Sequence, residues 1–157
     1  ENAPLNLLLE QDNLQINTIS DGSDIELNNA TVTAYRVPHR ESLETGTLGY
    51  VIEGPVRSLL YLTDIDEWTA PTRELVEQVD IALVDGTFWN TEELNRSDDV
   101  PHPYIEDSVE ILDSKKTDIY FTHLNHTNPV LDTESQQLEQ LSNAGFHIAE
   151  QGATFGL

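Results

Sequence analysis

The spacing of apolar residues predicts strands for most of the chain, with helices between the later ones. Short runs rich in β-branched and aromatic residues are typical of strands, and they recur from residue 30 onward. The run at residues 58–63, SLLYLT, is apolar almost throughout, which indicates a buried strand. Strands are predicted at residues 31–37, 47–53, 58–63, 80–84, 118–122 and 146–149. Weaker apolar pieces at residues 5–9 and 14–19 are predicted to be edge strands.

Three segments carry apolar residues three or four positions apart, which is the spacing of one helix face. They lie at residues 71–79, 104–113 and 133–144, and Gly145 is expected to end the last of them. Several strands followed by alternating helices and strands predict one α/β domain over residues 1–157, with a mixed sheet and helices on one face. The strand at 58–63 is apolar on both sides, so the second face of the sheet needs a partner or a missing part of the protein to cover it.

Composition narrows the classes of partner. Seven lysines and arginines stand against 29 acids in 157 residues, a net charge of −22 that argues against nucleic acid and anionic membranes as partners. Only Lys115 and Lys116 are lysines, which resembles salt-adapted proteins, although a solvated acidic surface is the more ordinary explanation. Cysteine is absent, which excludes disulfides and thiolate metal sites.

No apolar run approaches the ~20 residues of a membrane span, and no signal peptide is evident. We expect a cytoplasmic protein and, because methionine is absent, a processed product or a fragment.

Three residues that can bind metals follow three different predicted strands. His39 follows the first, Asp64 follows the run 58–63, and His123 follows the run 118–122. Strand ends in an α/β sheet converge on one rim, where ligands usually bind. Imidazole and carboxylate suit zinc, and also iron or manganese. Each residue also has an ordinary interpretation, as a polar loop residue or, for Asp64 together with Asp66, as a cap of the helix that follows.

Two other histidines have simpler interpretations. His147 lies inside a predicted strand and is expected to be structural. His126 is expected to be a loop residue held by Asn125 and Asn128, although these three are also candidates for substrate binding, because they follow His123 in the same loop.

Taken together, the runs VPHR, LLYLTDID, DIALVDGTFW, VPHP and FTHLNHTNP resemble the second half of metallo-β-lactamase-fold hydrolases. The resemblance covers about residues 30–157 and is nearest to the B-protein family of pyrroloquinoline quinone biosynthesis, and more distant to a tRNA 3′-processing endonuclease. It implies that His39 completes the site of a first metal, that Asp64 bridges two metals, and that His123 binds the second. It further implies proton transfer by His102 and an orienting role for Asp85 behind a metal-bound histidine.

One departure from the family pattern is large. The signature H-x-H-x-D-H, which supplies most of the metal ligands, does not occur in the chain. The family fold is a four-layer αββα sandwich of two similar halves, and the signature belongs to the first half. The chain therefore resembles the second half alone, with the first half or a second copy of the chain as its expected partner.

The resemblance implies a hydrolase in which two metal ions, zinc by expectation, activate water against a small-molecule substrate. Asp64 and His102 are the residues expected to take part in catalysis. We expect the isolated half to be inactive. Two alternatives stay open: an incomplete half-domain that acts as a binding or assembly module, and a non-haem iron site that uses oxygen.

Overall fold

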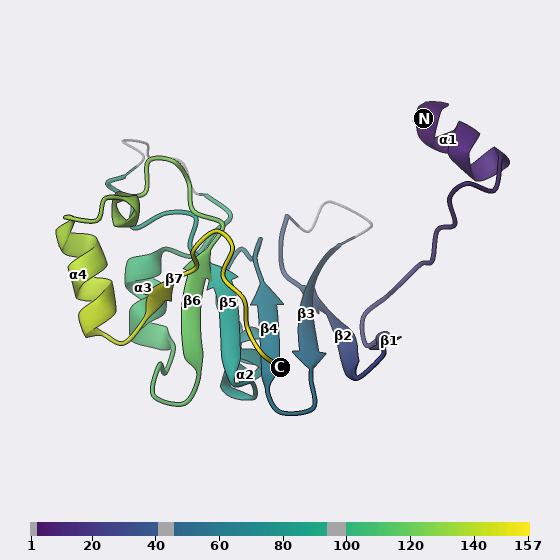
Figure 1. Ribbon diagram of the computed structural model, residues 1–157. Helices are drawn as coiled ribbons and strands as arrows, with labels where there is room; N and C mark the ends of the chain where they lie inside the picture. Colours follow the sequence, from purple (N-terminus) through teal and green to yellow (C-terminus); the bar gives the residue numbers. More distant parts are fainter. Residues whose placement is uncertain (1–2, 41–45, 94–99) are drawn as a thin grey trace.

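A computed structural model describes residues 3–40, 46–93 and 100–157 of the chain (Figure 1). Within these residues, seven strands form one sheet in which spatial order follows chain order. The strands are β1 (Asp24–Leu27), β2 (Ala30–Val37), β3 (Thr47–Glu53), β4 (Ser58–Leu62), β5 (Ile81–Asp85), β6 (Asp118–Thr122) and β7 (His147–Ile148). The sheet is mixed, as the sequence predicted: β1 to β4 pair antiparallel, and β4 to β7 pair parallel.

Each connection between two neighbouring parallel strands contains a helix, because the chain must cross over the sheet to run in the same direction again. The helix α2 (Ala70–Glu77) joins β4 to β5, α3 (Ile105–Ile111) joins β5 to β6, and a 3-10 turn, η1 (Pro129–Leu131), with α4 (Gln136–Asn143) joins β6 to β7. Thr69 caps α2 in a reciprocal pair with Thr72, in which each side chain bonds to the backbone N–H of the other. Gly145, at φ 83°, lies just beyond α4.

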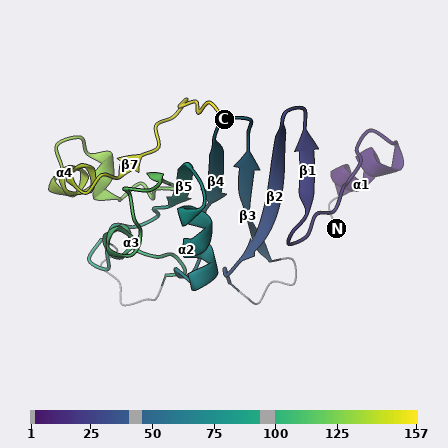
Figure 2. The ribbon, with the colours of Figure 1, turned by 90° about the horizontal axis from the view of Figure 1, so that it is seen from below.

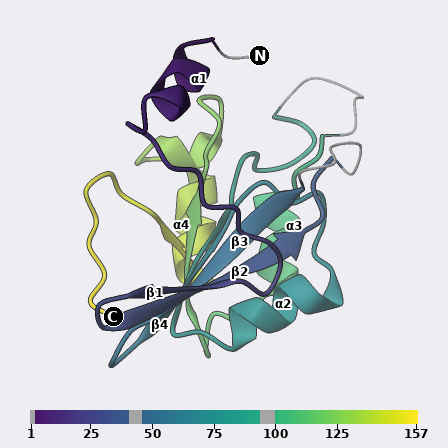
Figure 3. The same cartoon turned by 90° about the vertical axis from the view of Figure 1, so that its right-hand side faces the viewer.

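The main core lies between the sheet and its helices. The views in Figures 2 and 3 show α2 and α3 against one face of the sheet. Alternate residues of the central strands, including Leu60, Val84 and Phe121, point into this layer and are fully buried. They pack with Val76 of α2 and Ile105 of α3. Burial of each large apolar side chain of this kind is worth about 1.5–3 kcal/mol, so this layer holds the central strands in place.

The opposite face of the sheet is only partly covered. The C-terminal segment that follows β7 crosses in front of the central strands (Figure 1), and its Phe155 ring lies 5.2 Å from that of Tyr120 on β6. Leu157 passes so close to Gly54 that a side chain there would collide with it at 2.5 Å. Tyr61, on the same face of β4, is still 44% exposed. A sheet face of this kind is a candidate interface.

The N-terminal prediction was wrong. Residues 5–9 belong to a helix, α1 (Ala3–Glu10), and residues 14–19 form neither helix nor strand. The leucines of α1 are good helix formers, and with no β-branched residue beside them they carry no strand preference. The structure also contains β1, which the sequence did not reveal because its run DIEL is short and mostly exposed.

His147 stands in β7, but its side chain is exposed and lies against the ring of Tyr120, with the ring centres 4.9 Å apart. None of the described helices has the length and apolarity that crossing a membrane requires.

Candidate metal centre

The candidate centre lies where three parallel strands end together. In Figure 1 the arrows of β4, β5 and β6 point toward the same edge of the sheet. Asp64 lies two residues beyond β4, Asp85 is the last residue of β5, and His123 directly follows β6. The register pairs Leu62 with Val84 on the next strand, so the three strand ends are level. The topology thus brings together groups that are far apart in sequence.

Two of these residues have unusual backbone conformations. Asp64 has φ 57° and His123 has φ 61°, in the left-handed region that side chains disfavour. A non-glycine residue in such a region costs on the order of 1–3 kcal/mol, and such residues cluster at functional sites. One restraint is visible: the backbone N–H of Asp64 donates to Oδ2 of Asp85 over 2.8 Å.

The Asp64 carboxylate faces a different histidine with each oxygen. Its Oδ1 lies 3.7 Å from Nε2 of His39, and its Oδ2 lies 3.8 Å from Nε2 of His123. Both separations are too long for hydrogen bonds. Two ligands of one tetrahedral zinc ion stand about 3.4 Å apart, given bonds of about 2.0–2.2 Å. The two gaps therefore suit metal ligands better than they suit direct contacts.

His102 lies between the other two imidazoles. Its ring centre is 5.5 Å from that of His39 and 5.5 Å from that of His123. Asp64, His102 and His123 each offer one ligand atom, and these atoms lie within 4.8 Å of one another. The sequence had grouped His39, Asp64 and His123 as metal ligands and had kept His102 for proton transfer. The structure brings the three histidines around the carboxylate of Asp64, and the division of roles among them stays a prediction.

His39 has a second acidic neighbour, Asp66, which sequence reasoning had considered only as a helix cap; the cap of α2 is Thr69. Nδ1 of His39 lies 3.1 Å from Oδ1 of Asp66, yet this buried nitrogen forms no hydrogen bond with any of the described residues. Asp66 also accepts a hydrogen bond from the backbone N–H of Arg40 over 3.0 Å. The run TDID carried this signal, since its two acids lie two residues apart after β4.

Asp85 lies behind the imidazoles and is fully buried. Its Oδ2 is 2.9 Å from Nδ1 of His102 and 3.5 Å from Nδ1 of His123. Burial acts to raise the pKa of Asp85, but hydrogen bonds from His102 and Thr87 and the charge of His102 outweigh it and hold the pKa below its ordinary value. Asp85 is therefore an anion at neutral pH, placed to orient both rings.

Thr87 is a residue that sequence reasoning missed, although it stands in the quoted run DGTFW. Its hydroxyl lies 2.8 Å from Oδ1 of Asp85, 3.2 Å from Nδ1 of His102 and 3.1 Å from Nδ1 of His123. Gly86, between Asp85 and Thr87, packs against β6 so closely that a Cβ atom would lie 2.9 Å from that of Phe121. Glycine at this position lets the loop approach β6.

The three candidate substrate-binding residues differ in their placement. His126 is exposed. Asn125 donates a side-chain hydrogen bond to Thr127 over 2.6 Å. Asn128 is buried, and its amide donates to the carbonyls of Gly86 and Thr87 and accepts from the N–H of Val130. Asn128 thus supports the loop from beneath, whereas His126 is open to a ligand.

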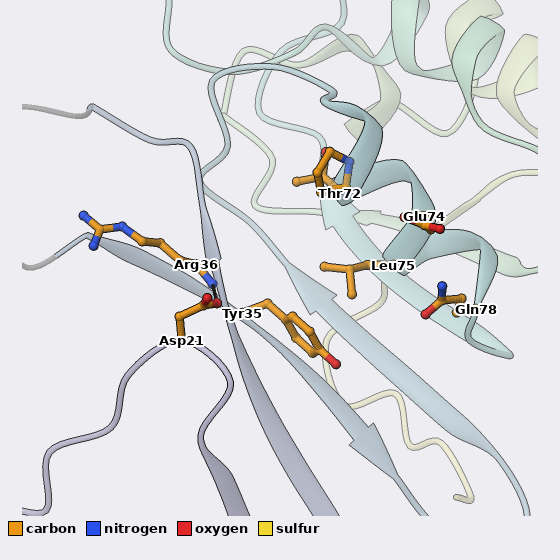
Figure 4. Close-up of a pocket in the computed structure, with 8 residues that line it drawn as sticks. Asp21, Tyr35, Arg36, Thr72, Glu74, Leu75 and Gln78 are labelled. Atoms are coloured by element: carbon orange, nitrogen blue, oxygen red, sulfur yellow. Dashed lines mark hydrogen bonds between the residues drawn. The ribbon is translucent and has the colours of Figure 1, made fainter.

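A separate cavity of about 380 Å³ lies between β2 and α2 (Figure 4). The close-up shows Leu75 of α2, Gln78 directly after α2 and Tyr35 of β2 around it, while the Arg36 side chain points away from α2. Asp21 at its rim accepts a hydrogen bond from the backbone N–H of Arg36 over 2.7 Å. Its described lining contains no histidine, so the metal-binding chemistry of the chain gathers at the strand ends instead.

Comparisons with known proteins agree with the fold. Residues 1–124 match the family described as β-lactamase superfamily domain. The chain is 29% identical over 133 residues to coenzyme PQQ synthesis protein B of Azotobacter vinelandii, covering 76% of this chain and 44% of that protein. It is 31% identical over 130 residues to the protein of the same name from Nitrosococcus oceani, covering 73% and 42%.

Solved structures show the same likeness. The crystal structure of zinc-bound PqqB from Methylobacterium extorquens superimposes with a TM-score of 0.75 at 25% identity, covering 90% of this chain and 52% of that one. A diphosphatase of the PhnP family shares the fold with a TM-score of 0.66 at 23% identity, covering 94% and 51%. The chain thus spans less than half the length of the two curated relatives and about half of each structural neighbour.

Proposed function

The chain belongs to the β-lactamase superfamily, and on that premise we propose that it is the part of a metal-dependent hydrolase that carries Asp64 and its three histidines. In this proposal the enzyme is related to the PQQ synthesis B proteins and acts on a small molecule. It works in the cytoplasm and does not bind nucleic acid. The observation that carries the proposal is the Asp64 carboxylate, whose two oxygens face Nε2 atoms of two different histidines at 3.7 and 3.8 Å.

The residues of the site fit zinc by their chemistry. Imidazole nitrogen and carboxylate oxygen are ordinary zinc ligands, and the zinc-bound structural neighbour supports this choice over iron or manganese. His39 and Asp64 would hold one ion, and His123 with the other oxygen of Asp64 would hold a second. Bound zinc supplies a Lewis acid and a water whose pKa is lowered toward neutrality.

The protein residues have separable tasks around that centre. Asp64 holds its position through the Asp85 carboxylate, which fixes its backbone N–H. His102 is the proton donor to the leaving group in this proposal, because imidazole is a common general acid and base in catalysis. The Asp85 anion, 2.9 Å from Nδ1 of His102, stabilises the protonated ring until it gives up its proton from Nε2. His126 and Asn125, in the loop after His123, contact the substrate.

In this proposal the ligands of the chain itself retain zinc, and residues from outside these 157 complete the sites for catalysis. The H-x-H-x-D-H signature is missing, and the matched relatives are more than twice as long as the part that this chain matches. The sheet face opposite α2 and α3 offers the docking surface: Tyr50, Tyr61, Leu83 and Tyr120 pair in one row across it. We propose that the first half of the sandwich packs on this row and completes the metal sites, and that the chain alone has little activity.

A second candidate function follows from the same face. If no metal binds, the row from Tyr50 to Tyr120 makes the chain an assembly module that pairs through its sheet. Metal binding separates the two functions. The enzyme binds zinc through Asp64, whereas a module binds none.

The test loads the purified chain with zinc, removes excess ion by gel filtration, and measures retained metal by mass spectrometry. Asp64→Asn removes the proposed bridging charge, and Asp107→Asn, on an exposed position of α3, removes an equal charge elsewhere. We expect zinc in the unaltered chain and in Asp107→Asn, and loss of zinc in Asp64→Asn. Equal retention in all three, or none in any, contradicts the proposal. In a parallel loading with equal amounts of ferrous iron and zinc, retention of iron in preference to zinc favours the oxygen-using site instead.

A further inference from the structure

We propose that Thr87 is a positioning residue that keeps His123 protonated on Nδ1 and supports, beside Asp85, the same protonation of His102, so that Nε2 of each ring stays free to act in the site. The consequence for zinc rests on the proposed function, but the protonation itself does not. The argument depends on where the single hydroxyl proton of Thr87 lies and on which neighbouring atoms can donate.

The Thr87 hydroxyl is surrounded by three polar atoms. Oδ1 of Asp85 lies at 2.8 Å, Nδ1 of His123 at 3.1 Å and Nδ1 of His102 at 3.2 Å. A hydroxyl has one proton to donate and two lone pairs that accept. All three contacts can be made at once only if the hydroxyl proton goes to one neighbour and the other two neighbours donate.

The carboxylate of Asp85 accepts the hydrogen bond that the Thr87 hydroxyl donates. Its Oδ1 accepts from the backbone N–H of Thr87 over 3.0 Å, and its Oδ2 accepts from the N–H of Asp64 over 2.8 Å. Both oxygens thus act as acceptors, as in an ionised carboxylate. The Thr87 hydroxyl must then donate to Oδ1, and its lone pairs accept from Nδ1–H of both histidines. Each neutral imidazole has one N–H, so Nε2 of each ring carries a free lone pair.

Thr87 is itself held firmly in place. Only 8% of the residue is exposed, and its carbonyl accepts from the backbone N–H of Asn125 over 3.0 Å and from the side chain of Asn128 over 3.3 Å. With its N–H, its carbonyl and its hydroxyl all bonded, the side chain cannot turn away without breaking several contacts. In the loop after β6, Asn125 and Asn128 thus hold Thr87 in place beside the rings of His102 and His123.

The two histidines depend on Thr87 to different degrees. Nδ1 of His102 has a second acceptor, Oδ2 of Asp85, at 2.9 Å. For His123 the same oxygen lies at 3.5 Å, beyond the usual hydrogen-bond range. Loss of the Thr87 hydroxyl should therefore leave His102 protonated on Nδ1 and release His123 to exchange its proton between the two nitrogens.

The test compares Thr87→Val, which keeps the shape and loses the hydroxyl, with Thr87→Ser, which keeps the hydroxyl. Thr117→Val is the matched control, because it removes another buried hydroxyl, bonded to carbonyls of Val76 and Val79. Long-range proton–nitrogen NMR at about pH 8.5, where imidazole is neutral, reads which nitrogen of each histidine carries the proton in the metal-free chain. Far-ultraviolet circular dichroism checks that each variant is folded.

We expect Nδ1–H on both rings in the unaltered chain, in Thr87→Ser and in Thr117→Val. In Thr87→Val, His102 should keep Nδ1–H while His123 becomes a mixture of the two forms. Zinc affinity should fall about 10–100-fold in Thr87→Val and recover in Thr87→Ser, as for other residues that support a ligand. Nδ1–H on His123 in folded Thr87→Val overturns the inference. A changed His123 signal with no zinc binding by the unaltered chain upholds it and refutes the proposed function instead.

Discussion

Oδ2 of Asp85 accepts a hydrogen bond from the backbone N–H of Asp64 over 2.8 Å, so one buried acid fixes the residue whose carboxylate faces two histidines. The same oxygen lies 2.9 Å from Nδ1 of His102. Asp85 thus links the backbone beyond β4 to an imidazole of the site. Its single carboxylate couples the left-handed turn at Asp64 to the orientation of the rings.

Asp85→Asn should destabilise the fold, and more so at neutral than at acidic pH. The pKa of Asp85 is below its ordinary value in the folded chain, so its anion adds stability above the unfolded pKa of about 3.9. That contribution is lost as the pH falls through the still lower folded-state pKa. Urea unfolding of both proteins between pH 7 and pH 3 measures it, and the difference in free energy of unfolding should shrink with falling pH.

Asp80→Asn serves as the comparison. Asp80 is an exposed acid whose pKa is also lowered, first by the backbone N–H of Ser58, but it lies away from the strand ends that carry the site. It should show a pH dependence of the same sign while zinc binding stays unchanged. A pH-independent effect of Asp85→Asn would mean that its charge does not contribute to folding.

His102→Ala tests the division of roles among the histidines. If His102 transfers a proton and holds no metal, the assembled enzyme should keep its zinc and lose about 10²–10⁴-fold in kcat. Metal analysis and steady-state kinetics on the complete protein measure the two effects. Loss of zinc in this variant would instead make His102 a ligand, in line with its place in the cluster with Asp64 and His123.

Added salt should raise the melting temperature of the chain. A net charge of −22 strains the folded state by self-repulsion, and salt screens that repulsion. We expect the melting temperature to increase between low salt and ~0.5 M sodium chloride, as followed by circular dichroism. A flat or falling curve would show that the acids are already paired or widely spread.

The open sheet face predicts that the chain is not a free monomer. Burial of ~600 Å² of apolar surface is worth on the order of 15 kcal/mol before the costs of association. Light scattering should therefore report a species larger than 17.6 kDa, a dimer or a complex with the missing half. Tyr61→Asp should weaken that association. Val56→Asp should not, because Val56 lies in the turn before β4 and is already 82% exposed. A monodisperse 17.6 kDa species for the unaltered chain would refute the prediction.

The central sheet could be predicted because burial there is strongly patterned. Residues 47–53 and 118–122 are strands with the predicted bounds, and the helices at 71–79, 104–113 and 133–144 are present with shorter bounds. The N-terminal segment could not be predicted in this way. The leucines of α1 are largely exposed, so no burial pattern distinguishes helix from strand there.

The site could be predicted only at the level of strand ends. Sequence reasoning placed Asp64 and His123 on one rim, and the register of β4 to β6 explains why they meet. The run TDID located Asp66 after β4, but its contact with His39, like that of Thr87 with His123, depends on how the loops fold against one another. The run DGTFW around Thr87 could be recognised in the sequence, but the hydrogen-bond partners of the Thr87 hydroxyl could not be predicted from it.

The most direct test of the account is X-ray absorption at the zinc edge of the zinc-loaded chain, because it reads the atoms bound to the ion. The account predicts a shell of nitrogen and oxygen at about 2.0–2.2 Å with the outer scattering pattern of imidazole. The imidazole pattern should weaken in His123→Ala. It should stay unchanged in His147→Ala, which alters an exposed histidine of β7. A shell of oxygen alone, or one that His123→Ala leaves unaltered, would contradict the claim that this strand-end cluster is a metal centre.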